Sequence, residues 1–301
     1  RDWSLTLAVV GVYFLLRDIN ESLPDDVKIP GLKGIYGHQF SEQTLVYKMM
    51  DIIYPTKCIR FTGKQLDDTG MGGAPDYYLR KGENILLIES KDFLIRADKK
   101  ATFDFNVYEE EIGKTLHFEL RPNGTRKAGA VLQLINNIKR ILKKEFTADT
   151  SYHYKDVFIY PVLITHDHQY DTPGFNDLVN DWFQDELISL GEYGLFIKRV
   201  KPIVVVNIDS LIFYQSGLAE KIPLHEMLKH YHEYTRITTK LKFRTNEEFE
   251  KYKRDRMSKM LPFSLFITKY FDKHDFWKVP PIMDVVVPEL FKEEIEKNRT
   301  Q

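Results

Sequence analysis

The sequence contains almost no cysteine: Cys58 is the only one in 301 residues. A single thiol cannot form a disulfide within the chain, which excludes a small disulfide-stabilised scaffold and fits a reducing, cytoplasmic location. The thiolate-rich ligand set of a structural zinc site is absent for the same reason. We therefore expect any metal in this protein to be bound through oxygen ligands.

A hydrophobic run long enough to cross a membrane is also missing. The most apolar stretch, residues 3–16, is shorter than the approximately 20 residues that a bilayer requires. It lacks the positive start and small-residue cleavage site of a signal peptide. We expect no membrane partner and predict that residues 1–30 form an apolar segment packed on the core. Because the chain begins without methionine, we also expect that further domains or partner proteins lie outside it.

An excess of charge of either sign is absent as well. The 43 basic and 44 acidic residues give a formal charge of −1, so attraction of the whole molecule to a polyanion cannot drive binding. There is no internal repeat and no low-complexity linker, and a hydrophobic content of 43% is sufficient for a large core. Length alone allows one large domain or two.

What the sequence does contain is a strong β-hairpin signal. Residues 76–81 and 84–92 are β-prone runs around Gly82, which allows the positive φ of a tight turn. If Lys81 pairs with Asn84 across the turn, counting outward along both strands places Asp76 opposite Glu89. Cross-strand Cβ atoms lie roughly 4.5–5.5 Å apart, close enough for two carboxylates to share a divalent cation.

The hairpin also carries a lysine beside the two acids. Lys91 follows Glu89 by two positions, so strand alternation places both on one face. Residues 85–88 are all aliphatic, which is typical of a strand covered on both faces. Charged groups that follow a buried strand usually mark a site, because ionised side chains are rarely left there unpaired. The alternative is a surface hairpin with solvated charges.

This arrangement resembles the active-site signature of the PD-(D/E)xK nuclease superfamily, which has the restriction-endonuclease-like fold. The matching residues are Pro75-Asp76, a spacer of residues 77–88, and Glu89-Ser90-Lys91. The resemblance implies an α/β fold with a mixed central sheet flanked by helices. It also implies that Asp76, Glu89 and the Ser90 carbonyl hold Mg²⁺ or Mn²⁺. Lys91 would then orient or deprotonate water, or stabilise charge on the phosphate.

The superfamily places a helix before the hairpin, and residues 41–53 have the matching periodicity, with Ser41 as a candidate N-cap. The resemblance implies that Glu42 on this helix supplements the metal site. The alternative for Glu42 is an acid placed favourably at a helix N-terminus.

A second helix is predicted after the hairpin, over residues 128–144. Its polar and basic stripe comprises Gln133, Asn137, Arg140 and Lys144. The resemblance implies that Gln133 borders the active site, and we predict that Arg140 and Lys144 contact nucleic acid. A solvated helix face is the alternative.

Further elements extend the predicted sheet. Residues 157–164 form a buried strand that ends at His166-Asp167-His168, which is either a polar strand-end loop or a catalytic cluster. A helix over residues 175–190 and a strand over residues 203–209 have the pattern of a right-handed crossover, which adds another strand.

We divide the chain into a nuclease-like core, residues 31–215, and a mostly helical region, residues 216–301. Basic residues outnumber acids over residues 236–259, which predicts either a phosphate-binding patch or a solvated helix. The nucleic-acid contacts predicted here are Lys240, Lys242, Arg244, Lys251 and Arg254.

The sequence therefore predicts a divalent-metal-dependent nuclease that hydrolyses phosphodiester bonds, with DNA favoured over RNA as partner and with self-association left open. One alternative is a catalytically silent nucleic-acid-binding module with the same fold. Another is a phosphodiesterase built on His166, Asp167 and His168.

Overall fold

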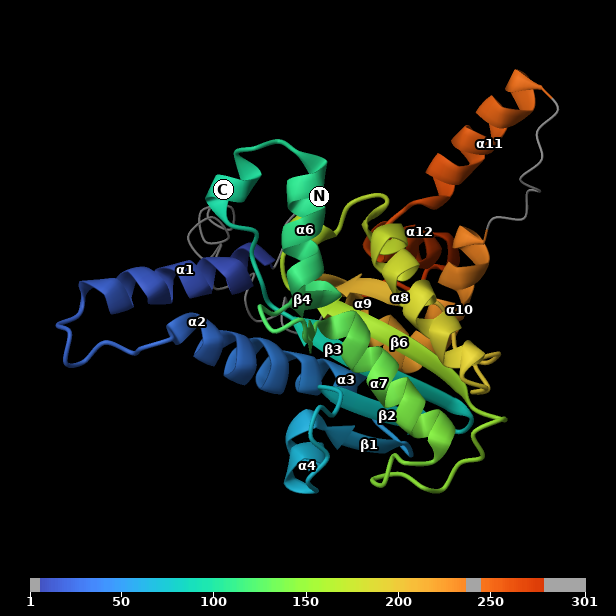
Figure 1. Ribbon diagram of the computed structural model, residues 1–301, viewed down its shortest axis with the longest axis horizontal. Helices are drawn as coiled ribbons and strands as arrows, with labels where there is room; N and C mark the ends of the chain where they lie inside the picture. The colour runs from blue at the N-terminus through green and yellow to red at the C-terminus, as the bar shows by residue number, and fades with distance from the viewer. Residues whose placement is uncertain (1–5, 237–244, 279–301) are drawn as a thin grey trace, which may run out of the picture.

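A computed structural model describes residues 6–236 and 245–278, with side chains described from residue 13 on. At its centre lies one five-stranded mixed sheet with the order β1-β2-β3-β6-β7 (Figure 1). β1, β2 and β3 are antiparallel, whereas β3, β6 and β7 run parallel to one another. The strands are Ile59–Thr62, Tyr77–Lys81, Asn84–Lys91, Phe158–Thr165 and Val204–Asn207.

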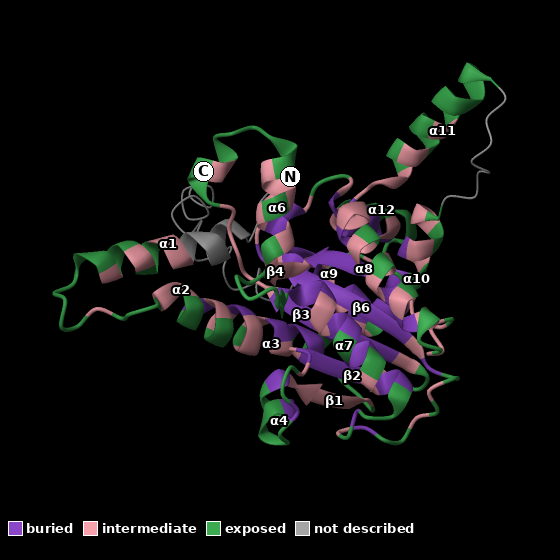
Figure 2. Cartoon of the chain, in the orientation of Figure 1, coloured by how far each residue is buried: buried purple, intermediate pink, exposed green. Residues whose placement is uncertain are grey.

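Helices cover both faces of this sheet, so the fold is α/β with two hydrophobic cores. On the first face pack α3 (Tyr47–Ile53), α9 (Ile208–Glu220), α10 (Leu224–Thr235) and α12 (Phe263–His274). On the second face pack α6 (Phe105–Leu116), α7 (Ala130–Lys143) and α8 (Phe175–Glu192). The buried strands lie between the two helical layers (Figure 2).

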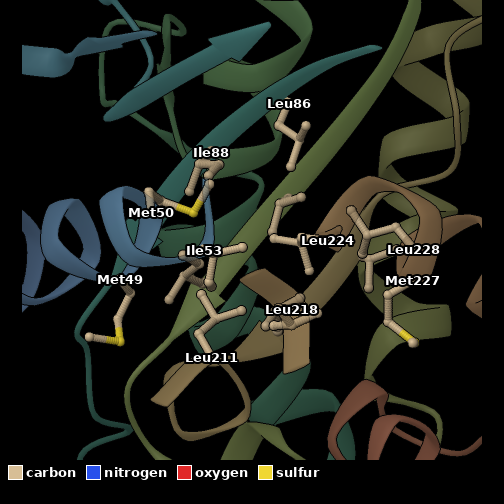
Figure 3. Close-up of a cluster of buried hydrophobic side chains, with 14 of the residues drawn as sticks. Met49, Met50, Ile53, Leu86, Ile88, Leu211, Leu218, Leu224, Met227 and Leu228 are labelled. Atoms are coloured by element: carbon tan, nitrogen blue, oxygen red, sulfur yellow. The ribbon is translucent and has the colours of Figure 1, made fainter. Parts of the chain in front are cut away.

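The predicted hairpin register is confirmed. Lys81 pairs with Asn84 and Tyr77 with Ile88, and the turn contains Gly82 at φ 60°. Alternation along β3 sends Leu86 and Ile88 into the first core and Ile85 and Leu87 into the second. In Figure 3, Leu86 and Ile88 lie among side chains of α3, α9 and α10.

The crossover after β6 is also confirmed. α8 lies between β6 and β7 in the chain, and β7 pairs with β6 in parallel. No prediction from the sequence covered β1, α4 (Gly63–Asp68), α5 (Ala97–Lys100) or the small hairpin of β4 (Phe118–Leu120) and β5 (Arg126–Ala128). These elements are short, and none of the residues in β1 is fully buried, so their hydrophobic periodicity is weak.

The helix before the hairpin begins earlier than predicted. α2 (Leu32–Ile35) continues into η1, a π-helical segment from Tyr36 to Val46, and then into α3. Ser41 is therefore not an N-cap, and its hydroxyl instead donates to Asp92 at 2.8 Å. π-Helical turns are rare, and those inserted in α-helices are frequently found at functional sites.

The N-terminal segment differs from the expectation of a buried element. It forms α1 (Thr6–Ser22), which contacts α2. Leu15 and Leu16 are exposed, so this part of α1 does not pack into either core. In the part of the chain that the structure describes, no helix is both long and apolar enough to cross a membrane.

The predicted boundary between residues 215 and 216 falls inside α9. Helices beyond it share the first core with the sheet, because Leu228 of α10 and Phe271 of α12 belong to that cluster. Among the helices that the structure describes after α9, α11 (Asn246–Lys259) is the one that has no buried residue, and it projects away from the sheet (Figure 1). Lys251 and Arg254 are exposed on α11, and Lys240, Lys242 and Arg244 lie outside the described residues.

Candidate active site

The structure brings the two acids and the lysine of the hairpin together. Asp76 immediately precedes β2, and its Oδ2 accepts a hydrogen bond of 2.7 Å from the Ser90 amide of β3. Lys91 Nζ lies 3.1 Å from Glu89 Oε2. The Glu89 side chain is fully buried, and its Oε1 has no hydrogen-bond partner among the described residues. The open end of the hairpin therefore holds a buried carboxylate with one unused oxygen.

A close backbone contact fixes the position of Asp76. The Gly63 amide, at the start of α4, donates to the Asp76 carbonyl at 2.7 Å. A Cβ at residue 63 would lie 3.2 Å from both the Cα and the carbonyl oxygen of Asp76. Glycine is needed here because the two backbones approach so closely.

The charges of the site shift one another's pKa. Burial and the neighbouring Asp76 carboxylate raise the pKa of Glu89 well above its ordinary value. Burial alone would lower the pKa of Lys91, but the surrounding Glu89 and Asp76 carboxylates outweigh this effect and raise it. Lys91 therefore stays protonated at neutral pH, whereas Glu89 requires an added positive charge to remain ionised at low energetic cost.

Glu42 belongs to the same electrostatic cluster. Burial and the Asp76 carboxylate raise its pKa. Tyr47 donates a hydrogen bond to Glu42 Oε1 at 3.0 Å, and His38 Nδ1 lies 3.1 Å from Oε2. The π-helical segment thus places Glu42 within electrostatic range of Asp76 and Lys91.

The polar stripe of α7 holds the loop that leads into Asp76. Asn137 is fully buried and donates to the Gly73 carbonyl at 3.0 Å. Arg140 donates to the carbonyls of Gly73 and Gly72 at 3.1 and 2.6 Å. Its guanidinium is thereby engaged with the protein backbone. Lys144 lies just beyond the end of α7, with its ammonium 5.4 Å from the centre of the Tyr154 ring.

Beside this loop lies a basic hollow of about 530 Å³. Gln133 is half-buried in its wall, together with Arg140, Lys139 and Lys143. The stripe predicted from the sequence did not include Lys139 and Lys143. It was drawn through Asn137, and in the structure Asn137 faces the loop that precedes Asp76. Lys139 and Lys143 are four positions apart and could have been found as a second, exposed stripe on the same helix.

The three residues of the His166-Asp167-His168 string do not converge. His166 Nε2 lies 2.8 Å from Ser90 Oγ, and burial lowers the pKa of His166 to about 4. Asp167 accepts from the amide of Gln169, while His168 Nε2 lies 3.1 Å from Asp209. The three side chains therefore have different hydrogen-bond partners, while the Asp209 carboxylate acts electrostatically on both histidines.

The donor atoms of the hairpin suit a divalent cation of the magnesium type. Within residues 6–236 and 245–278, no group of three or more histidine, cysteine, aspartate and glutamate side chains is arranged to hold a metal ion. Mg²⁺, however, is usually held by one or two carboxylates and completed by water and substrate phosphates. Asp76, Glu89 and the Ser90 carbonyl are hard oxygen donors, and Glu89 Oε1 is unused. The residues therefore fit such an ion.

Comparison of this chain with models of protein families, with curated proteins and with solved structures gave no match.

Proposed function

We propose that this protein is a divalent-metal-dependent nuclease that hydrolyses phosphodiester bonds, with DNA as its substrate in preference to RNA. The observation that carries the proposal is the buried Glu89 carboxylate, which lies beside a second acid and has one oxygen unused. A bound Mg²⁺ or Mn²⁺ would supply the missing positive charge, activate water and polarise the phosphate.

The order of elements around the hairpin supports the restriction-endonuclease-like fold. A helical segment ending in α3 precedes the hairpin, α7 follows it, and β6 then pairs with β3 in parallel. This is the arrangement that the PD-(D/E)xK resemblance implies around the two acids and the lysine.

Lys91 has a narrower role in this proposal than the sequence allowed. A general base at neutral pH would need a depressed lysine pKa, whereas the carboxylates around Lys91 raise it. We therefore assign the Lys91 ammonium to the stabilisation of negative charge that builds up on the phosphate. Glu42 is available on the neighbouring helical segment to orient water.

The basic hollow on α7 provides a path for the substrate backbone. Lys139 and Lys143 are exposed in its wall. The same hollow is lined by Gly72 and Gly73, which precede Asp76 by a few residues. Phosphates bound there would extend directly toward the candidate active site.

The proposal is tested by cleavage of mixed DNA and RNA substrates in Mg²⁺ or Mn²⁺, with EDTA as the metal-free control. Asp76→Ala, Glu89→Gln and Lys91→Ala should each reduce cleavage by about 10²-fold or more, because each removes charge that acts on the reacting phosphate. Asp149→Asn is a matched control, since Asp149 is a buried carboxylate paired with Arg80 away from the site.

Cleavage at the wild-type rate by the Asp76→Ala protein would contradict the proposal. Persistent nucleic-acid binding without any metal-dependent cleavage by the wild type would instead favour the silent binding module.

A further inference from the structure

Ser90 has two hydrogen bonds, one through its backbone and one through its side chain. Its amide donates to Asp76 Oδ2 at 2.7 Å. Its hydroxyl lies 2.8 Å from His166 Nε2. His166 is only 1% exposed, so no substrate can reach its ring directly. The hydrogen bond to Ser90 is therefore the direct contact by which His166 can act on the candidate active site.

The surroundings of the two ring nitrogens of His166 indicate which of them carries the proton. Burial of the ring disfavours its charged form, in which both nitrogens would carry a proton. Its Nδ1 is buried and has no hydrogen-bond partner among the described residues. A buried N–H without a partner is rarer than an under-used acceptor, so the proton belongs on Nε2. His166 Nε2–H then donates to the Ser90 hydroxyl.

We propose that His166 is a positioning residue of the candidate metal site, which holds Ser90 between Glu89 and Lys91. This inference rests on the proposed nuclease function. Glu89 and Lys91 are the neighbours of Ser90 in the chain, so a shift of its backbone moves both side chains and the Ser90 carbonyl. Partners that orient the ligands of a metal site typically contribute about 10–100-fold to metal affinity or activity.

His232 provides a matched control within the same chain. Its pKa is also lowered by burial to about 4, its Nε2 is hydrogen-bonded to the Pro202 carbonyl at 3.0 Å, and its Nδ1 also lacks a partner among the described residues. It lies on α10 and has no contact with the hairpin acids. Loss of either imidazole removes one hydrogen bond of a ring nitrogen, but only His166 contacts Ser90.

The experiment measures Mn²⁺ binding to the 301-residue chain by calorimetry and its thermal stability in EDTA. His166→Asn places its amide near the position of Nδ1 and loses the bond to Ser90, whereas His166→Gln can place a donor near the position of Nε2. We expect His166→Asn to weaken Mn²⁺ binding by about 10–100-fold. His166→Gln should recover most of the affinity. Ser90→Ala should reproduce the loss, and its combination with His166→Asn should add little.

His232→Asn should lower thermal stability to a similar extent while leaving Mn²⁺ affinity unchanged. Three results are decisive. Wild-type Mn²⁺ affinity in His166→Asn and Ser90→Ala, with affinity abolished in Glu89→Gln, overturns the role of His166 and leaves the proposed function intact. Equal loss of affinity in His166→Asn and His232→Asn shows a general stability effect and also overturns it. No Mn²⁺ binding by the wild type overturns both proposals.

Discussion

At the scale of single residues, the chemistry of the hairpin depends on Glu89 being buried next to another acid. A carboxylate in this position is costly to ionise, because it loses water and faces the charge of Asp76. Lys91 offsets part of that cost through its contact with one of the two carboxylate oxygens. The remaining cost in the metal-free protein is the physical reason to expect a cation at this position.

This cost predicts a pH-dependent stability difference between the wild type and Glu89→Gln in EDTA. The folded-state pKa of Glu89 is raised, so the wild type loses stability as the pH rises from the ordinary value of 4.5 through the folded-state value. Glutamine does not ionise. At neutral pH we expect Glu89→Gln to be more stable by about 1–3 kcal/mol, and the difference should vanish below pH 4.5.

Urea denaturation of both proteins across this pH range measures the difference. Glu83→Gln, at the exposed hairpin turn, serves as the control and should match the wild type throughout. Saturating Mn²⁺ should stabilise the wild type but not Glu89→Gln, because a ligand stabilises only the protein that binds it. A less stable Glu89→Gln protein at neutral pH would show that the carboxylate is not strained.

At the scale of elements, α7 carries two neighbouring polar stripes with different surroundings. Asn137 and Arg140 hold the backbone of the loop that precedes Asp76, whereas Lys139 and Lys143 are exposed in the adjoining hollow. One stripe therefore positions a candidate catalytic residue, and the other is free to meet phosphates. α11 provides a competing basic surface, because none of its residues is buried.

Charge reversal distinguishes the two surfaces. We expect the double variant Lys139→Glu/Lys143→Glu to weaken DNA binding and to lower the slope of log affinity against log salt by about 2, since each phosphate contact contributes roughly 0.9. Lys251→Glu/Arg254→Glu on α11 changes the net charge equally and is the matched control. Fluorescence anisotropy at several salt concentrations measures both. A loss of DNA affinity in the α11 variant alone would show that the nucleic acid binds that helix and not the hollow on α7.

At the scale of the whole molecule, the C-terminal helices are part of the structure that supports the site. Gly217 of α9 packs directly against α12, and a Cβ on it would lie 2.2 Å from Phe271 Cε1. Phe271 is fully buried in the core that also contains Leu86 and Ile88 of β3. The hairpin therefore depends on helices that follow it by more than a hundred residues in the chain.

This packing predicts that Gly217→Ala destabilises the protein by about 1–3 kcal/mol, because the added methyl group forces Phe271 to move. Gly34→Ala is a matched control, since Gly34 is also helical but no other residue lies within 4 Å of the position that its added methyl group would occupy. We expect it to be neutral or stabilising by up to about 1 kcal/mol. Thermal unfolding compares the two, and equal stabilities would contradict close packing of α9 on α12.

The local features of the hairpin could be read from the sequence because they depend on neighbours in the chain. The turn at Gly82 and alternation along the two strands determine the register, and the register determines that Asp76, Glu89 and Lys91 lie together. Helices α7 and α8 were predicted because their buried faces repeat with a clear period, and strand β6 because its apolar residues form a continuous run.

Tertiary contacts decided everything that depends on residues far apart in the chain. No period in the sequence indicates that Asn137 and Arg140 bind the backbone carbonyls of residues 72 and 73. Nor does one indicate that His166, which follows β6, contacts Ser90 on the neighbouring strand β3. The pairing of β3 with β6 places His166 near Ser90, and burial then keeps its ring neutral. The sequence by itself determined which groups could perform chemistry, because local geometry places them on one hairpin. Only the tertiary structure decided which groups hold them in position, because that depends on packing between distant elements.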